Sequence, residues 1–205
     1  MRQHVNPLSD KYQTPILPPE WEKVFADATR PLHLDIGCGK GHFLVEMAQQ
    51  QPDWNFLGLE IRELLVEQAC LGQQKLGLRN LHYLFCNVNN SLRPLLASLS
   101  SGSLQRVTIQ FPDPWFKKRH QKRRVVQPEL VDDLATFLVS GGSVLIQSDV
   151  KAVAVEMRDR FATHPDFEQQ GEAWLSTNPL PVPTERERLT LASGEPVYRA
   201  LLSRR

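Results

Sequence analysis

The sequence has few cysteines and no arrangement of histidines or cysteines that is typical of a metal site. Its three cysteines, Cys38, Cys70 and Cys86, are odd in number and lack paired spacing. This predicts reduced thiols that pack inside a cytoplasmic protein, and it excludes a disulfide framework or a zinc motif. None of the six histidines stands at ligand spacing beside a cysteine or a carboxylate, so we expect no metal.

Long hydrophobic runs are also missing. Nowhere do about 18 apolar residues follow one another, as a membrane-spanning helix requires. Residues 1–7 hold a single basic residue and no apolar run, so we expect neither a secretory signal nor a membrane anchor. With 41% hydrophobic and 23% charged residues, the composition is that of a globular protein. The sequence does not distinguish a monomer from a homodimer.

Positive charge is concentrated in one segment. The net charge is only +1, yet six of the 24 lysines and arginines fall within residues 117–124, and the rest of the chain is mildly acidic. A single basic segment on an acidic body indicates that a polyanion is bound at one place, although a solvated surface loop explains the pattern equally well.

Prolines separate an N-terminal arm from one larger domain. Residues 1–30 are polar and contain four prolines before Trp21, which interrupt any long helix. From residue 31 to residue 205, short apolar runs alternate with segments of helical periodicity. This pattern predicts an α/β fold, in which a mostly parallel sheet carries helices on both faces.

The expected elements follow from these runs. We expect strands at 31–36, 54–60, 81–86, 104–111 and 142–148, and helices at 41–50, 62–76, 127–139 and 151–163. A proline-bearing loop and a final strand near 198–202 complete the domain.

A glycine loop follows the first expected strand. Asp35 is followed by Gly37, Gly39 and Gly41, and a helix is expected to begin at His42. Alternate glycines let the backbone turn sharply and approach a ligand at a helix N-terminus. A dinucleotide-binding loop needs glycine or alanine where His42 stands, so the pattern favours S-adenosylmethionine, with the Asp35 carboxylate near its amino group or sulfonium.

The next two strands also end in polar side chains. Glu60 ends the second strand, where a carboxylate can accept hydrogen bonds from both ribose hydroxyls, and Asn87 follows the third strand, where an adenine would lie. Each feature alone is equally typical of a helix cap. Three strand ends in this order, after the glycine loop, predict a nucleoside cofactor.

The fourth strand leads into a distinctive turn. Pro112 and Pro114 restrict the backbone on both sides of Asp113, which aims this carboxylate at the ligand-binding edge of the sheet. A carboxylate can accept from the ring N–H and the exocyclic amino group of guanine, an edge that adenine does not offer. Trp115 or Phe116 can stack on a base, or both can be core residues.

The run from Phe111 to Arg124 resembles the signature of the tRNA (guanine-N7)-methyltransferase family, and residues 35–41, Glu60 and Asn87 match its cofactor positions in order. The resemblance extends to residues 147–149 and 184–187 and so covers nearly the whole domain. This chain departs from the usual pattern with Phe116 in place of proline, Ser148 in place of threonine and Arg186 in place of an aromatic residue.

The resemblance implies a Rossmann-like class I methyltransferase fold with a seven-stranded sheet, over residues 31–205. It implies transfer of a methyl group from S-adenosylmethionine to N7 of the guanine at position 46 in the tRNA variable loop. The N-terminal arm then contacts RNA or is flexible. The residues that correspond to cofactor-binding positions are Asp35, Gly37, Gly39, Glu60, Asn87 and Asp113, of which Asp113 is also catalytic. Those at substrate positions are Lys117, Asp149, Thr184 and Glu187, and those at RNA-binding positions are Lys118, Arg119, Lys122, Arg123 and Arg124.

Two alternatives are compatible with parts of this pattern. An exocyclic-amine methyltransferase also carries an Asp-Pro-aromatic turn after the fourth strand, but it does not need the basic segment that follows. A catalytically dead RNA-binding module does not need the acids at positions 35, 60 and 113. Thr184 and Glu187, taken alone, also match a helix-capping pattern.

Overall fold

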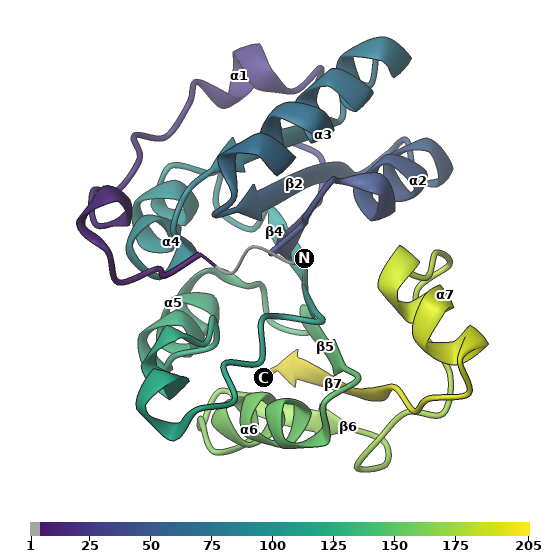
Figure 1. Cartoon of the computed structure of the whole chain (residues 1–205). Coiled ribbons are helices and arrows are strands. Elements are labelled where there is room, and N and C mark those ends of the chain that lie inside the picture. Colours follow the sequence, from purple (N-terminus) through teal and green to yellow (C-terminus); the bar gives the residue numbers. More distant parts are fainter. Residues whose placement is uncertain (1–4) are drawn as a thin grey trace.

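The computed structural model describes residues 5–205 and is built around one seven-stranded sheet (Figure 1). The first four residues of the expected N-terminal arm lie outside the described part. The strands are β1 (Leu32–Ile36), β2 (Asn55–Glu60), β3 (Leu81–Phe85), β4 (Leu104–Gln110), β5 (Ser143–Ser148), β6 (Phe167–Gln170) and β7 (Tyr198–Arg204).

The strand order is β3-β2-β1-β4-β5-β7-β6. The first five strands of this order are parallel, and β7 runs antiparallel to both of its neighbours. The predicted α/β fold with a mostly parallel sheet is confirmed. Because the order reverses direction at β1, the carboxyl ends of β1 and β4 border a crevice where open α/β sheets bind ligands.

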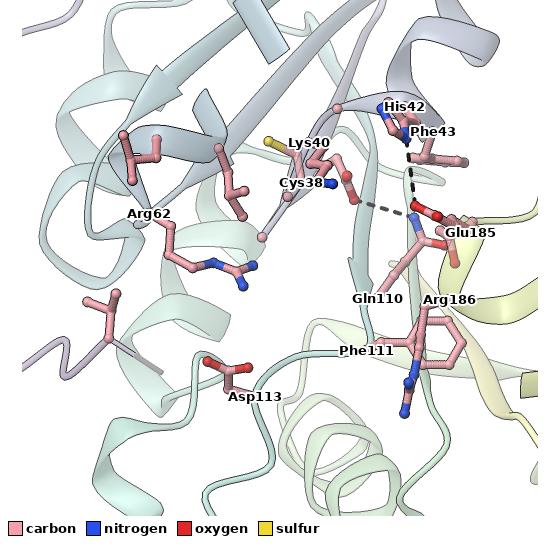
Figure 2. Close-up of a pocket in the computed structure, with 18 of the residues that line it drawn as sticks. Cys38, Lys40, His42, Phe43, Arg62, Gln110, Phe111, Asp113, Glu185 and Arg186 are labelled. Atoms are coloured by element: carbon pink, nitrogen blue, oxygen red, sulfur yellow. Dashed lines mark hydrogen bonds and ion pairs between the residues drawn. The ribbon is translucent and has the colours of Figure 1, made fainter. Parts of the chain in front are cut away.

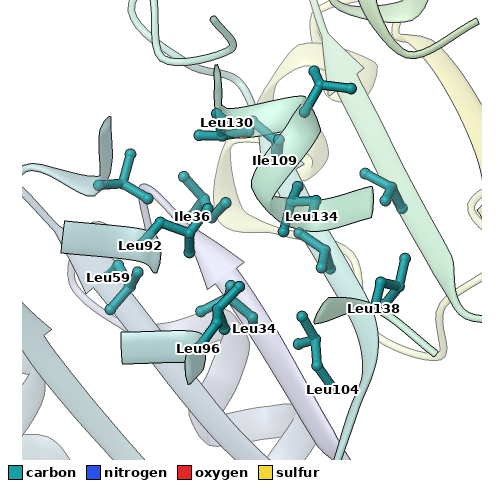
Figure 3. Packing of buried hydrophobic residues seen from close by; sticks show 14 of the residues in the cluster. Leu34, Ile36, Leu59, Leu92, Leu96, Leu104, Ile109, Leu130, Leu134 and Leu138 are labelled. Atoms are coloured by element: carbon teal, nitrogen blue, oxygen red, sulfur yellow. The ribbon is translucent and has the colours of Figure 1, made fainter. Parts of the chain in front are cut away.

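Helices cover both faces of the sheet (Figure 1). They are α1 (Trp21–Val24), α2 (His42–Gln50), α3 (Glu63–Leu76), α4 (Val88–Ala97), α5 (Pro128–Phe137), α6 (Lys151–Ala162) and α7 (Glu185–Ala192). Side chains of α1, α4, α5 and α6 share one core cluster with the sheet, and those of α2 and α3 share the other. Figure 3 shows the first cluster, where leucines of β1 and β2 interdigitate with leucines of α4 and α5.

The sequence predicted the six longest strands but did not predict β6, α1, α4 or α7. Helix α4 contains Pro94, which normally argues against a helix interior. Its apolar face compensates, because Leu92, Leu95 and Leu96 are buried against the sheet. Burial that depends on the tertiary fold therefore outweighs a local signal that is unfavourable.

The described part of the N-terminal arm lies along α4. The carbonyl of Tyr12 accepts hydrogen bonds from the side-chain amides of Asn87 (3.2 Å) and Asn90 (2.7 Å). Further along, Trp21 stacks on Phe25 with ring centroids 5.9 Å apart, and both are buried in the core. The arm thus forms part of the wall beside the carboxyl end of β3.

Candidate functional site

A cleft of about 770 Å³ lies at the carboxyl ends of the central strands (Figure 2). Its volume is within the range of about 300 to 1,000 Å³ that is usual for small-molecule sites. The wall contains the glycine loop, the start of α3, the turn after β4 and the start of α7, together with Val5, Lys11 and Tyr12 of the arm. A smaller hollow of about 110 Å³ adjoins it beside Asn87 and Asp113.

The glycine loop has the conformation that its sequence requires. Gly37, Gly39 and Gly41 all have positive φ angles, of 84°, 58° and 75°. A Cβ atom added at Gly37 or Gly39 would meet no atom within 4 Å, so this backbone faces open space in the cleft. At Gly41 the same atom would come within 2.4 Å of the Tyr83 hydroxyl, which donates a hydrogen bond to the Gly41 carbonyl (2.8 Å).

Asp35 is buried at the end of β1. One carboxylate oxygen accepts hydrogen bonds from the Thr108 hydroxyl (2.6 Å) and from the Gln110 amide (3.4 Å). Burial raises the pKa of Asp35 to about 6, against the opposing effect of these two bonds, and the charge of Glu60 adds to the rise. A cationic ligand would therefore stabilise the ionised form of this buried carboxylate.

Glu60, at the end of β2, accepts four hydrogen bonds within the protein. The donors are the backbone N–H of Gly39 and the backbone N–H, Nε and Nη2 of Arg62, each at 3.0 Å. The bonds to Glu60 raise the pKa of Arg62, so the guanidinium stays charged. Figure 2 shows the Arg62 guanidinium and the Asp113 carboxylate pointing into the cleft from opposite sides.

Asn87 has the helix-capping role that the sequence left open, and it also binds the arm, which the sequence did not indicate. Its amide nitrogen donates to the carbonyls of Pro7 (3.1 Å) and Tyr12 (3.2 Å), and its oxygen caps α4 by accepting from the N–H of Asn89 (3.2 Å). In this structure the side chain joins the arm to α4 at the border of the smaller hollow. Its contact with an adenine stays a prediction.

The turn that carries Asp113 is held in an unusual conformation. Phe111 and Trp115, on either side of Pro112-Asp113-Pro114, have positive φ angles of 50° and 43°. For bulky residues this conformation costs about 1 to 3 kcal/mol each and occurs where the surrounding structure enforces it. Asp113 lines both the cleft and the smaller hollow.

Arg124 is one of the groups that hold this turn. Its Nε donates to the Pro114 carbonyl (2.8 Å), and its guanidinium forms an ion pair with Glu156 of α6. Only 11% of the Arg124 side chain is exposed. The resemblance implied an RNA-binding role for Arg124, whereas in the structure its side chain is turned inward against Pro114 and Glu156.

The remaining cations of the segment lie on the surface. Lys117, Lys118, Arg119 and Lys122 are exposed, the last three on a short 3-10 helix (Lys118–Arg123). Arg123 is half-buried, with its guanidinium 5.0 Å from the centroid of the Trp115 ring. Phe116 is 75% exposed, which excludes a core position for this aromatic residue in the structure.

The expected substrate residues lie around α7. Thr184 caps this helix by accepting from the N–H of Glu187 (3.1 Å), so the capping pattern is present, and Thr184 also lines the cleft. Glu187 is buried and accepts from Gln147 (3.0 Å), Asn178 (2.8 Å) and Arg199 (2.7 Å). Its carboxylate thus has an internal cationic partner.

Asp149 is paired with the residue that departs from the usual pattern. The Arg186 guanidinium forms an ion pair with the Asp149 carboxylate, with Arg186 Nε 2.9 Å from Oδ2. Arg188 similarly binds Glu46 of α2 (2.7 Å), so ion pairs attach α7 to α2 and to the residue that follows β5.

The structure brings Asp35, Asp113 and Thr184 to one cleft, with Glu60 beside it in the smaller hollow. Sequence reasoning missed Arg62 and Gln110, which also line the cleft. The position of Gln110 at the end of β4, two residues after Thr108, is a signal that could have identified it, whereas no local signal identifies Arg62.

Comparison with known proteins identifies the family. A family model described as "Putative methyltransferase" matches residues 29–200. A protein of Trichormus variabilis named tRNA (guanine-N(7)-)-methyltransferase is 65% identical over 205 residues, which cover 100% of this chain and 95% of the relative. The chain belongs to this methyltransferase family. A relative of the same name from Synechococcus elongatus is 59% identical over 204 residues, covering 100% of this chain and 96% of that protein.

Solved structures confirm the fold. A precorrin-6y C5,15-methyltransferase from Geobacter metallireducens aligns with a TM-score of 0.57 at 14% identity, covering 89% of this chain and 85% of that one. An aminoglycoside resistance methyltransferase, NpmB1, aligns with a TM-score of 0.55 at 14% identity, covering 87% and 89%. The predicted class I methyltransferase fold is confirmed, and S-adenosylmethionine is the methyl donor of the family.

The residues of the cleft and of the adjoining hollow fit this cofactor. A glycine backbone open to the cleft, a buried carboxylate at Asp35 and a second at Glu60 are the groups that an amino acid joined to a ribose requires. Within residues 5–205, no three histidine, cysteine or acidic side chains lie close enough together to hold a metal ion. Over the same residues, no helix is long and apolar enough to cross a membrane.

Replacing Glu60 with alanine tests the ribose contact. We expect the variant to bind S-adenosylmethionine about 1 to 3 kcal/mol more weakly, which is about 5- to 150-fold, because two hydroxyl donors lose their acceptor. Isothermal titration calorimetry measures the change, and Glu67→Ala on the exposed face of α3 is the matched control. An unchanged affinity in a folded Glu60→Ala protein contradicts the ribose assignment.

Proposed function

We propose that this protein transfers a methyl group from S-adenosylmethionine to N7 of a guanine in tRNA, and that the target is the guanine at position 46 of the variable loop. The turn after β4 carries this proposal, because it presents one carboxylate to the cleft and leads directly into exposed cations. The full-length similarity to tRNA (guanine-N(7)-)-methyltransferases supports the choice of base and atom. Such a substrate places the enzyme in the cytoplasm.

Alignment is the main task of the residues in the cleft. The cofactor supplies a methyl group that a nucleophile can attack, and N7 of guanine already has a free lone pair at neutral pH. No base must remove a proton before transfer. Holding the two reactants in line can lower the barrier by about 7 to 11 kcal/mol at best. Asp35 and Glu60 fix one reactant, and the turn after β4 fixes the other.

Asp113 orients the base and stabilises developing charge. Its carboxylate accepts hydrogen bonds from the ring N–H and the exocyclic amino group of guanine. As transfer proceeds, the purine becomes positive, and a nearby carboxylate stabilises that charge. Glu187 is a second acidic group of the site, but its buried bond to Arg199 (2.7 Å) already neutralises much of its charge. Asp113 is therefore the principal electrostatic residue.

The RNA is held by Thr184, which lines the cleft, and by residues outside it. By resemblance to the family, Lys117, Asp149, Thr184 and Glu187 contact the substrate, and the exposed cations Lys118, Arg119 and Lys122 contact phosphates. Arg123 adds a contact through its partly exposed guanidinium. Arg124 acts through the loop, because its ion pair with Glu156 sets the position of the turn.

Methylation of defined tRNA transcripts tests the function. We expect label from S-adenosylmethionine to appear as N7-methylguanosine when position 46 is guanine. A transcript with 7-deazaguanine at that position keeps the shape of the base but has no N7, so it should accept no label. Label on an exocyclic amine, or equal label on the 7-deazaguanine transcript, contradicts the proposal.

Asp113→Asn tests the catalytic carboxylate. The substitution keeps the size but exchanges an acceptor oxygen for a donor, so one bond to guanine becomes a clash. We expect the rate constant of methyl transfer to fall by about 10² to 10⁴, which corresponds to about 3 to 5.5 kcal/mol. Single-turnover transfer at saturating cofactor and tRNA measures it, with exposed Asp53→Asn as control. A rate above about one third of native, a difference of about 0.65 kcal/mol, would make Asp113 a structural residue.

Neutralising Lys118 and Arg119 together tests their binding to phosphates. We expect weaker tRNA binding and a flatter salt dependence, with the log–log slope reduced by about 0.7 to 0.9 for each phosphate that no longer has a cationic partner. Cofactor affinity should stay unchanged. Lys75→Gln with Arg79→Gln removes two exposed cations near the end of α3 and is the matched control. An unaltered slope in the Lys118/Arg119 variant shows that the RNA lies elsewhere.

A further inference from the structure

A buried chain of hydrogen bonds leads from the middle of the sheet to the cleft. His33 of β1 is 0% exposed, and its Nε2 lies 3.0 Å from the Thr108 hydroxyl of β4. That hydroxyl donates to Asp35 at 2.6 Å. Asp35 and Thr108 are paired in the register of β1 and β4, and His33 lies two residues before Asp35 on the same face.

Counting protons fixes the direction of these bonds. A threonine hydroxyl has one hydrogen, and an ionised carboxylate can only accept, so the hydrogen of Thr108 points to Asp35. The hydroxyl oxygen then accepts from His33, which requires the hydrogen of the imidazole to be on Nε2. Burial, with the charge of Arg106 as a smaller cause, lowers the pKa of His33 well below its usual value and keeps the ring neutral.

This arrangement leaves the other ring nitrogen without a partner. His33 Nδ1 is buried and has no hydrogen bond within the described residues. An orphaned buried polar atom destabilises the folded protein, so a histidine here needs a reason beyond packing. An apolar residue would fill the space between Phe43 and Phe56 without that penalty.

We propose that His33 and Thr108 are positioning residues for Asp35, which keep its carboxylate charged and aimed at the amino group of the cofactor. This inference rests on the proposed use of S-adenosylmethionine. His33 acts through Thr108, because a donor to the hydroxyl oxygen polarises the hydroxyl and strengthens the bond that it makes to the carboxylate. Neither residue needs to touch the cofactor.

The other groups around Asp35 make this support necessary. Glu60 of β2 repels its charge, and burial raises the pKa of the Cys38 and Tyr83 side chains, so neither supplies a charge. Gln110 donates a longer bond, at 3.4 Å. Two hydrogen bonds lower the pKa of Asp35, and the bond from Thr108 has the larger effect. Loss of the Thr108 bond should therefore raise the pKa of Asp35 above 6.

The expected pH dependence follows from the charge of Asp35. An ammonium group binds the ionised carboxylate, so affinity for the amino end of the cofactor falls as the pH drops through the pKa of Asp35, about 6 in the ligand-free protein. Raising that pKa moves the loss of affinity to higher pH. A change that only disturbs packing weakens binding equally at every pH.

Calorimetric titration with S-adenosylhomocysteine between about pH 5.5 and 8.5 tests the proposal. In Thr108→Val, the midpoint for loss of affinity should rise by about one pH unit, giving up to about tenfold weaker binding on the acid side. His33→Phe should raise the midpoint by less. Thr108→Ser keeps the hydroxyl and should follow the native curve, and Ser103→Ala, which removes a buried hydroxyl just before β4, is the control.

A native midpoint in Thr108→Val overturns the proposal, even if binding is weaker throughout. An NMR titration of the ¹³C-labelled Asp35 carboxyl in the ligand-free protein gives a second readout that needs no cofactor. The proposal is supported, without the valine variant, if the pKa of Asp35 in this titration is native in Thr108→Ser and higher than native in His33→Phe. If native protein fails to bind S-adenosylhomocysteine, the proposed function fails, while the NMR titration still decides the role of His33 and Thr108.

Discussion

The site depends on the need to supply hydrogen-bond donors to carboxylates that are buried at the carboxyl edge of the sheet. Asp35 and Glu60 are almost inaccessible, and a charge in that position is stable only with close partners. The Thr108 hydroxyl serves Asp35, and the Gly39 backbone and Arg62 serve Glu60. Gly39, whose N–H binds Glu60, belongs to the glycine loop, and this loop directly follows Asp35. The loop and both carboxylates are therefore held together around the cleft.

The turn after β4 connects this unit to the outer surface. Its two aromatic residues with positive φ store strain that an isolated chain would not accept. Arg124 holds the turn in this conformation, because it binds the Pro114 carbonyl and Glu156 of α6 at the same time. The carboxylate of Asp113 is thereby fixed in the cleft while the cations that follow remain exposed. One short segment thus links the reacting centre to the surface that meets a polyanion.

The sequence predicted those parts of the site that are encoded by neighbouring residues. The glycine loop, the acids at the ends of β1 and β2 and the proline turn each depend on a few consecutive residues, and the structure places them around the cleft and the adjoining hollow, while their contacts with cofactor and substrate stay predictions. The inward position of Arg124 was not predictable, because Glu156 lies 32 residues away and a run of charges does not reveal which side chain turns inward. Likewise Asn87 is bound by the arm 75 and 80 residues earlier in the chain. The positions of both side chains thus depend on partners that are distant in the sequence.

The most direct test of the central claim is a crystal structure of the protein with S-adenosylhomocysteine. We expect the ribose hydroxyls to bind Glu60, Arg62 to leave that carboxylate to make room, and the amino group to lie against Asp35 beside the glycine loop. The Thr108 bond to Asp35 should remain in place. A nucleoside bound elsewhere, with the pairing of Arg62 and Glu60 intact, would contradict the account.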